Sequence, residues 1–127
     1  MTGSRRIEGW KLDAAARAEL LSRFPPRYGE TVADHVTYKP GPDGAKLPEA
    51  GHCVLVGRAD DGAGVEALVV ALNGSTDRPD GSTWHITWSL GPGRRAIESN
   101  AVIAQHGWQA IGGNIRIPLT PSWWMYP

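Results

Sequence analysis

The stretch HITWSL at residues 85–90 alternates polar and apolar side chains, a pattern typical of a half-buried β-strand. Successive side chains of a strand point to opposite faces of its sheet, so Ile86 and Trp88 share one face. These large apolar groups belong on a core, which leaves the imidazole of His85 and the neighbouring hydroxyls on a polar or solvent-exposed face. The alternation predicts a strand over residues 83–90.

The same His-x-Thr frame occurs upstream, where the chain reads HVTY at residues 35–38. His35 and Thr37 would share one face of a strand over residues 31–39, and Tyr38 would lie on the other. Each strand then presents an imidazole and a hydroxyl side by side, about 7 Å apart along the strand. Two of the four histidines of the chain therefore occupy equivalent positions in two expected strands.

Two helices are expected beside these strands. Ala14 to Arg23 is rich in helix formers, Asp13 is a suitable N-cap, and Pro25-Pro26 ends the segment. Residues 94–105 carry apolar side chains three or four positions apart, and Gly107 can cap the end of that helix.

Short apolar runs between turns mark the other strands. The runs at residues 53–56 and 65–72 flank a glycine-containing turn at residues 60–64 and predict a β-hairpin. The expected strands are residues 9–12, 53–56, 65–72 and 114–119. Residues 1–8 are expected to be frayed, and residues 121–127 are expected to form a short tail.

The order of these elements predicts an α+β fold, because strands joined by short turns pair in the antiparallel sense. Each His-x-Thr strand lies close in sequence to one amphipathic helix. We therefore expect antiparallel strands in two related lobes that face a cleft, with two main helices packed on the outside. A chain of 127 residues fits a single domain over residues 1–127.

The composition argues against several classes of protein. Thirteen Lys and Arg residues balance thirteen Asp and Glu residues, so no broad basic surface for long duplex nucleic acid is expected. Cys53 is the one cysteine, and the N-terminal residues lack the apolar run that a signal peptide or membrane span needs. We therefore expect a cytoplasmic protein that does not enter membranes. The sequence also lacks the glycine-rich motifs of triphosphate hydrolysis and dinucleotide binding.

Two imidazole and hydroxyl pairs that face each other across a cleft suit the hydrolysis of a phosphodiester, particularly a five-membered cyclic one. One neutral histidine takes a proton from the attacking water, and the other, protonated, gives a proton to the departing ribose oxygen. His35 and His85 are the candidates for these roles. The hydroxyls of Thr37 and Thr87 would donate hydrogen bonds to the non-bridging phosphate oxygens. This scheme requires no metal and no cofactor.

From about Trp10 to Leu119 the chain resembles the two-histidine (2H) phosphoesterase superfamily, whose hallmark is two His-x-Thr/Ser motifs on strands facing a cleft between similar lobes. The resemblance implies His35 and His85 as the proton-transfer pair and Thr37 and Thr87 as phosphate binders. It also implies an RNA end or nucleotide with a 2′,3′-cyclic phosphate or a 2′,5′ linkage as the partner. The run WHITWSL-x-x-Gly-Arg is similar to small 2H domains associated with RNA repair.

Further residues are candidates for substrate binding. Arg78, in the loop before the second motif, is a candidate fork-shaped donor to the phosphate. Tyr38 is a candidate for stacking on a base. Packing or solvation explains the other cationic and aromatic candidates at least as well. Those candidates are Lys39, Trp88, Arg94, Arg95, Trp123 and Trp124.

Two alternative functions stay open at this point. The first is a non-catalytic module that binds RNA ends or nucleotides through the same phosphate contacts. The second is a metal hydrolase that uses His35, His52 and His85 as ligands, although the adjacent His52 and Cys53 form only a weak metal motif. His106 is better explained as a cation at a helix C-terminus. Protein partners and the oligomeric state are not indicated by the sequence.

Overall fold

A computed structural model of the chain describes residues 5–40 and 52–126, which form eight strands and two helices. Their order is β1 (Arg5–Leu12), α1 (Ala14–Arg23), β2 (Glu30–Thr31), β3 (His35–Pro40), β4 (Cys53–Asp60), β5 (Val65–Leu72), β6 (His85–Leu90), α2 (Glu98–His106), β7 (Gln109–Arg116) and β8 (Leu119–Tyr126). The prolines and glycines of residues 40–44 predict a loop after the first motif strand, and this loop lies almost entirely outside the described residues.

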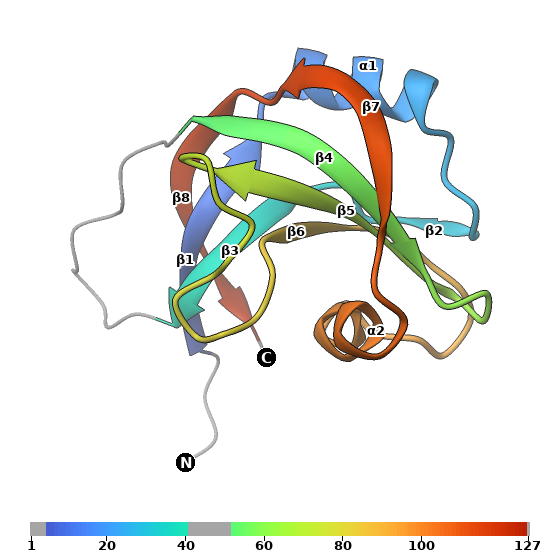
Figure 1. Ribbon diagram of the computed structural model, residues 1–127. Coiled ribbons are helices and arrows are strands. Elements are labelled where there is room, and N and C mark those ends of the chain that lie inside the picture. The colour runs from blue at the N-terminus through green and yellow to red at the C-terminus, as the bar shows by residue number, and fades with distance from the viewer. Residues whose placement is uncertain (1–4, 41–51, 127) are drawn as a thin grey trace.

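The strands form one antiparallel sheet in the order β7-β4-β5-β6-β3-β1-β8, and the short β2 pairs with β6. The two outermost strands of the sheet, β7 and β8, are consecutive in the chain. The sheet curls, as Figure 1 shows. A mostly antiparallel sheet with two helices confirms the α+β class.

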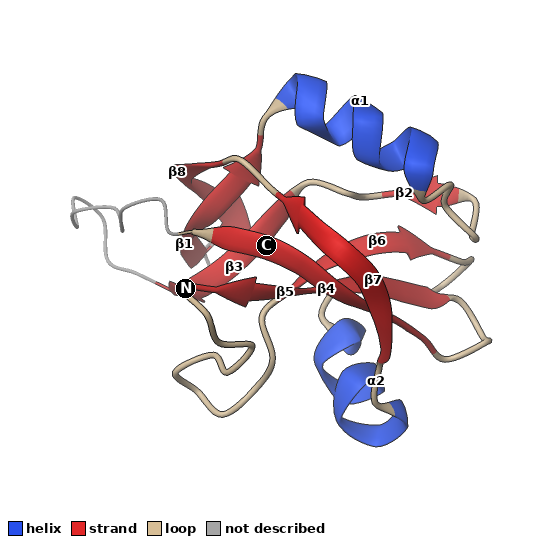
Figure 2. Cartoon of the chain, turned by 45° about the horizontal axis from the view of Figure 1, so that its top comes forward, coloured by secondary structure: helices blue, strands red, loops and turns tan. Residues whose placement is uncertain are grey.

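The two helices lie on opposite faces of the sheet (Figures 1 and 2). On the α1 side is the main core, which includes Leu20 of α1 together with Val36, Ile86 and Trp88. The indole Nε1 of Trp88 donates to the Phe24 carbonyl at 2.7 Å, just beyond the end of α1. On the other face α2 packs against β4 and β5 through two smaller apolar clusters. Each motif strand therefore has a core side and an α2 side.

The sheet consists of two halves that meet between β3 and β6, a boundary that we call the seam. The four strands β7-β4-β5-β6 make one half and β3-β1-β8 make the other. The ladder between β3 and β6 contains one pair, Val36 with Ile86. Just before β3, the amides of Val32 and Ala33 donate to the carbonyls of Trp88 and Thr87. Beyond the Val36 pair, the ladder between the halves ends.

Several predicted elements are confirmed. Helix α1 covers residues 14–23, and the carboxylate of its N-cap Asp13 accepts from the Ala16 amide at 3.3 Å. The predicted hairpin is formed by β4 and β5, whose ladder runs from Cys53–Leu72 to Asp60–Glu66.

The predictions for both ends of the chain are wrong within the described residues. Residues 5–8 are not frayed, because β1 starts at Arg5 and pairs with β8 along its whole length. The expected tail is instead most of β8, which completes the edge of the sheet. The strand expected at residues 114–119 is divided between β7 and β8. The break falls at Pro118, which has no amide hydrogen for a ladder.

Two other boundaries differ from the predictions. Helix α2 begins at Glu98 and not at residue 94, and its N-cap Ile97 has no side-chain capping bond. The Glu98 carboxylate accepts from the Arg95 amide at 2.6 Å, which satisfies a donor at this helix end. The strand expected over residues 31–39 is interrupted, because Ala33 adopts a positive φ of 44° between β2 and β3.

Candidate functional site

The seam brings both His-x-Thr motifs onto the same face of the sheet. Val36 and Ile86 are paired and both point into the main core, so the residues on either side of them point to the α2 face. In this register His35 and His85 occupy diagonal positions on neighbouring strands. Such positions lie about 7–8 Å apart. The structure therefore places the two predicted catalytic histidines next to each other across the seam.

The imidazole of His35 is oriented by Asp34. Its Nδ1 lies 3.0 Å from Oδ2 of Asp34, whose carboxylate also pairs with Nζ of Lys11 at 3.4 Å. Because a carboxylate only accepts, Nδ1 of His35 carries the proton, and Nε2 is the nitrogen left for proton transfer. The side chain of His35 is 24% exposed. Burial lowers the pKa of His35, and the hydrogen bond to Asp34 opposes that effect.

The imidazole of His85 is held by the backbone. Its Nδ1 lies 2.8 Å from the carbonyl oxygen of Thr83, so Nδ1 is again the donor and Nε2 the remaining nitrogen. Burial lowers the pKa of His85, the bond to Thr83 opposes that effect, and the positive charges of Arg78 and His35 lower the pKa further. Among the residues that the structure describes, no carboxylate bonds to this ring. The two histidines thus share a tautomer and differ in the group that holds them.

The two threonines have different surroundings. Thr37 is half-buried on the α2 face. Thr87 is 7% exposed, and its hydroxyl lies 2.9 Å from Oγ of Ser99 and donates to the Ala96 carbonyl at 3.3 Å. In this structure the hydrogen bonds of Thr87 therefore link β6 to α2 and to the residues just before it. Of the two predicted phosphate donors, Thr37 is the more accessible.

The predicted binding residues Arg78 and Tyr38 have structural contacts. Arg78 donates to the Tyr38 carbonyl from Nε at 3.2 Å and from Nη2 at 3.1 Å, which ties the loop before β6 to β3. Its charge still acts on His85. The ring of Tyr38 packs against Trp10 and Trp84, with centroid distances of 5.7 and 6.3 Å. The Tyr38 ring thus lies with the core and not on the imidazole face, because it alternates with Thr37 along β3.

Three residues near His35 are not among the predicted site residues, although Trp124 was a candidate for base stacking that packing explained at least as well. Asp34 directly precedes His35, so its proximity was readable from the sequence. Lys11 is paired with His35 in the β1–β3 ladder. The indole of Trp124 lies 4.2 Å from the His35 ring, centroid to centroid, and Lys11 Nζ lies 5.6 Å from the indole. Lys11 and Trp124 come from strands far apart in sequence, so only the register of the sheet reveals them.

The groups needed for the metal alternative are not assembled. Within residues 5–40 and 52–126, no three His, Cys, Asp or Glu side chains are grouped to hold a metal ion. Cys53 is buried in the main core, and burial raises the pKa of its thiol to about 12. His52 and Cys53 thus do not form a binding site together with the histidines at the seam.

Comparison with family models, curated proteins and solved structures gives no match for this chain. Neither of the helices in the described part of the chain is long and apolar enough to span a bilayer. What the fold itself defines is an α+β protein in which two His-x-Thr strands are neighbours in one antiparallel sheet.

The pKa directions of the two histidines predict a loss of stability in mild acid. Burial lowers the pKa of both rings below the usual value of 6.5, so the unfolded chain takes up protons first as the pH falls. The contribution is present above pH 6.5 and is lost as the pH falls toward the folded pKa values. It amounts to about 1.4 kcal/mol for each unit of pKa difference. Urea unfolding at pH 7.5 and 5 should show this drop.

A double variant, His35→Asn with His85→Asn, provides the control for this effect. It should lose less stability than the wild type over the same pH interval. An identical loss in both proteins would show that other groups cause the acid sensitivity.

Proposed function

We propose that the protein is a metal-independent phosphodiesterase that opens a 2′,3′-cyclic phosphate or cleaves a 2′,5′ linkage at an RNA end or in a nucleotide. The observation that supports this most strongly is the position of His35 and His85 at the seam. Both rings have Nδ1 bonded to the protein and Nε2 left for proton transfer. In 2H phosphoesterases the two motif strands face each other across lobes, and the two sheet halves correspond to those lobes in this proposal.

The partners of the two rings assign their roles in the proposed reaction. Asp34 stabilises the protonated form of His35, so His35 is the acid. His85 bonds to a carbonyl, has no carboxylate partner within the described residues, and lies near the cation of Arg78, so it is the neutral base. His85 Nε2 takes a proton from water as the water oxygen attacks phosphorus. The bond from phosphorus to the ribose oxygen then breaks, and His35 gives that oxygen its proton, which leaves a phosphomonoester.

The surroundings of the seam fit a small substrate better than a long duplex. Lys11 and Trp124 lie beside His35, where a cation and an aromatic ring favour a phosphate and an adjacent nucleobase. Thr37 supplies a hydroxyl on the same face. With a net charge of zero, the chain provides no general attraction for long nucleic acid. The cytoplasm is the proposed location.

The direct test uses a short RNA that ends in a 2′,3′-cyclic phosphate. Purified protein treated with a chelator should convert it to a 2′- or 3′-phosphomonoester, and chromatography against both isomers should identify the product. The rate should follow a bell-shaped pH profile, because one histidine must be neutral and the other protonated. Complete loss of activity on metal removal, or no turnover of cyclic and 2′,5′-linked substrates between pH 5 and 9, would contradict the proposal.

The hydrogen bonds of Thr87 favour a second candidate, a non-catalytic module for RNA ends. Because this hydroxyl is directed to Ser99 and Ala96, Thr37 is the one motif hydroxyl accessible to a phosphate in this structure. A binding module needs no second donor at a transition state. Saturable binding of the cyclic-phosphate RNA without product at any pH would support this candidate over the enzyme.

A further inference from the structure

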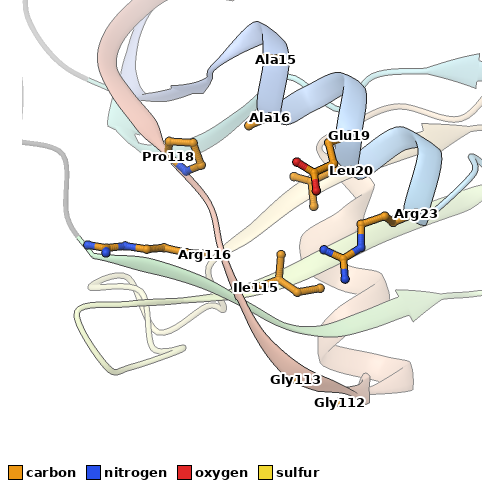
Figure 3. Close-up of a pocket in the computed structure, with 10 residues that line it drawn as sticks. All are labelled: Ala15, Ala16, Glu19, Leu20, Arg23, Gly112, Gly113, Ile115, Arg116 and Pro118. Atoms are coloured by element: carbon orange, nitrogen blue, oxygen red, sulfur yellow. The ribbon is translucent and has the colours of Figure 1, made fainter.

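A groove lies between α1 and β7, away from the seam and on the opposite side of the sheet from α2 (Figures 1 and 3). Its volume is about 520 Å³, which lies in the range of sites for small organic ligands. Leu20 from α1, Ile115 from β7 and Pro118 after β7 contribute apolar surface to it. The groove has no role in the proposed phosphodiesterase activity.

A wide bulge in β7 opens this groove. In the β4–β7 ladder, Leu55 pairs with Ile115 and Gly57 pairs with Ala110, so residues 111–114 stand opposite Val56. None of residues 111–114 has a register partner on β4. Gly113 has a φ of 92° that favours glycine. Gly112 has neither a positive φ nor a neighbour that a Cβ would meet, so the fold does not require glycine there, and its missing side chain leaves the groove open.

Charged groups lie around the apolar floor. Figure 3 shows the guanidinium of Arg23 and the carboxylate of Glu19 directed from α1 into the groove, while the side chain of Arg116, at the edge of the groove, points away from α1. Within the described part of the chain, no ion pair or side-chain hydrogen bond involves any of these three groups. Two cations against one carboxylate give the groove a net positive charge. Arg23 lies on the side of the groove where the Gly112-Gly113 backbone is exposed (Figure 3).

We propose that this groove binds an amphipathic organic acid. Its carboxylate lies between the Arg23 guanidinium and the exposed backbone of Gly112 and Gly113, because guanidinium and backbone amide groups are donors that a carboxylate accepts from. Its apolar chain lies along Leu20 and Ile115, where burial of apolar surface favours binding. The Glu19 carboxylate, one turn from Arg23, weakens the attraction and so selects against ligands with two negative charges.

The test measures the binding of three ten-carbon probes by isothermal titration calorimetry. Decanoate should bind, and decanol and decylammonium should bind at least about 10-fold more weakly, since the charge-assisted bond contributes a tenfold or larger factor. Arg23→Gln should weaken decanoate binding by a similar factor, and Gly112→Leu should abolish it by filling the groove. Glu19→Gln should strengthen binding. Arg95→Gln, an exposed arginine on the α2 side, is the matched control and should have no effect.

These substitutions lie at exposed positions, and an unchanged thermal unfolding transition of each variant confirms that it is folded. No measurable binding of decanoate, equal binding of decanoate and decanol, or unchanged binding by folded Arg23→Gln would overturn the proposal. Each result is independent of cyclic-phosphate turnover at the seam. The proposed groove ligand and the proposed enzymatic function can therefore be contradicted separately.

Discussion

Alanine at Glu66 is expected to lower the free energy of unfolding by about 3–5 kcal/mol, because it removes a fully buried carboxylate and leaves the partly buried Arg58 without its charged partner. The Glu66 side chain has no solvent exposure. Its Oε2 accepts from Nε and Nη2 of Arg58, and its Oε1 accepts from Oγ of Ser89 at 2.6 Å and from the Arg27 amide at 3.0 Å. Removing the carboxylate breaks all of these bonds at once, in strands β4 and β6 and in the loop after α1.

Urea unfolding at neutral pH measures this effect. Glu19→Ala, a glutamate exposed on α1, is the matched control and should change stability by no more than about 0.5 kcal/mol. A variant with Glu66→Leu and Arg58→Met should recover much of the loss, because it removes both charges of the pair. A loss below about 1 kcal/mol for Glu66→Ala would show that solvation of Arg58 compensates for the lost carboxylate and that the network contributes little.

Alanine at His85 is expected to reduce turnover of the cyclic-phosphate RNA by a factor of about 10²–10⁴, the usual contribution of one proton-transfer group. His35→Ala should have a comparable effect, because the proposed reaction needs both the acid and the base. The two variants should also alter opposite sides of the pH profile. Without the base the dependence at acid pH should flatten, and without the acid the dependence at alkaline pH should flatten.

His106→Ala is the matched control for these variants, since His106 is exposed at the end of α2, away from the seam. It should retain the wild-type rate. Near wild-type turnover by folded His35→Ala or His85→Ala would rule out two-histidine catalysis. Lost turnover with unchanged binding of the RNA would place both rings in the chemical step and not in recognition.

The elements that the sequence predicted best have strong local signals. Helix α1 has an N-cap, a run of helix formers and a diproline stop, so its boundaries need no tertiary information. The β4–β5 hairpin and the strand at HITWSL have clear apolar runs and turns. The edges of the sheet were missed because β1 and β8 stabilise each other over long sequence separation. Neither strand has a complete alternating pattern of its own.

The candidate site divides in the same way. Alternation along a strand predicted that each histidine would share a face with its threonine. It also predicted that Tyr38 would lie on the other face. The choice of Tyr38 as a site residue was therefore inconsistent with the alternation itself. The pattern could not show that α2 covers Thr87, because that contact depends on where Ser99 packs. Nor could it reveal Trp124, which reaches His35 through two successive ladders.

The single ladder pair at the seam has a thermodynamic consequence for any molecule that bridges His35 and His85. The ladders within each half of the sheet are longer than the single pair between them, so the coupling between halves comes mainly from the shared core and the chain connections. A bound molecule that contacts both imidazoles adds a cross-link between the two halves, at the boundary where only one ladder pair joins them. Binding should therefore slow amide hydrogen exchange in both halves of the sheet together. At saturation the unfolding of the whole domain should become more cooperative.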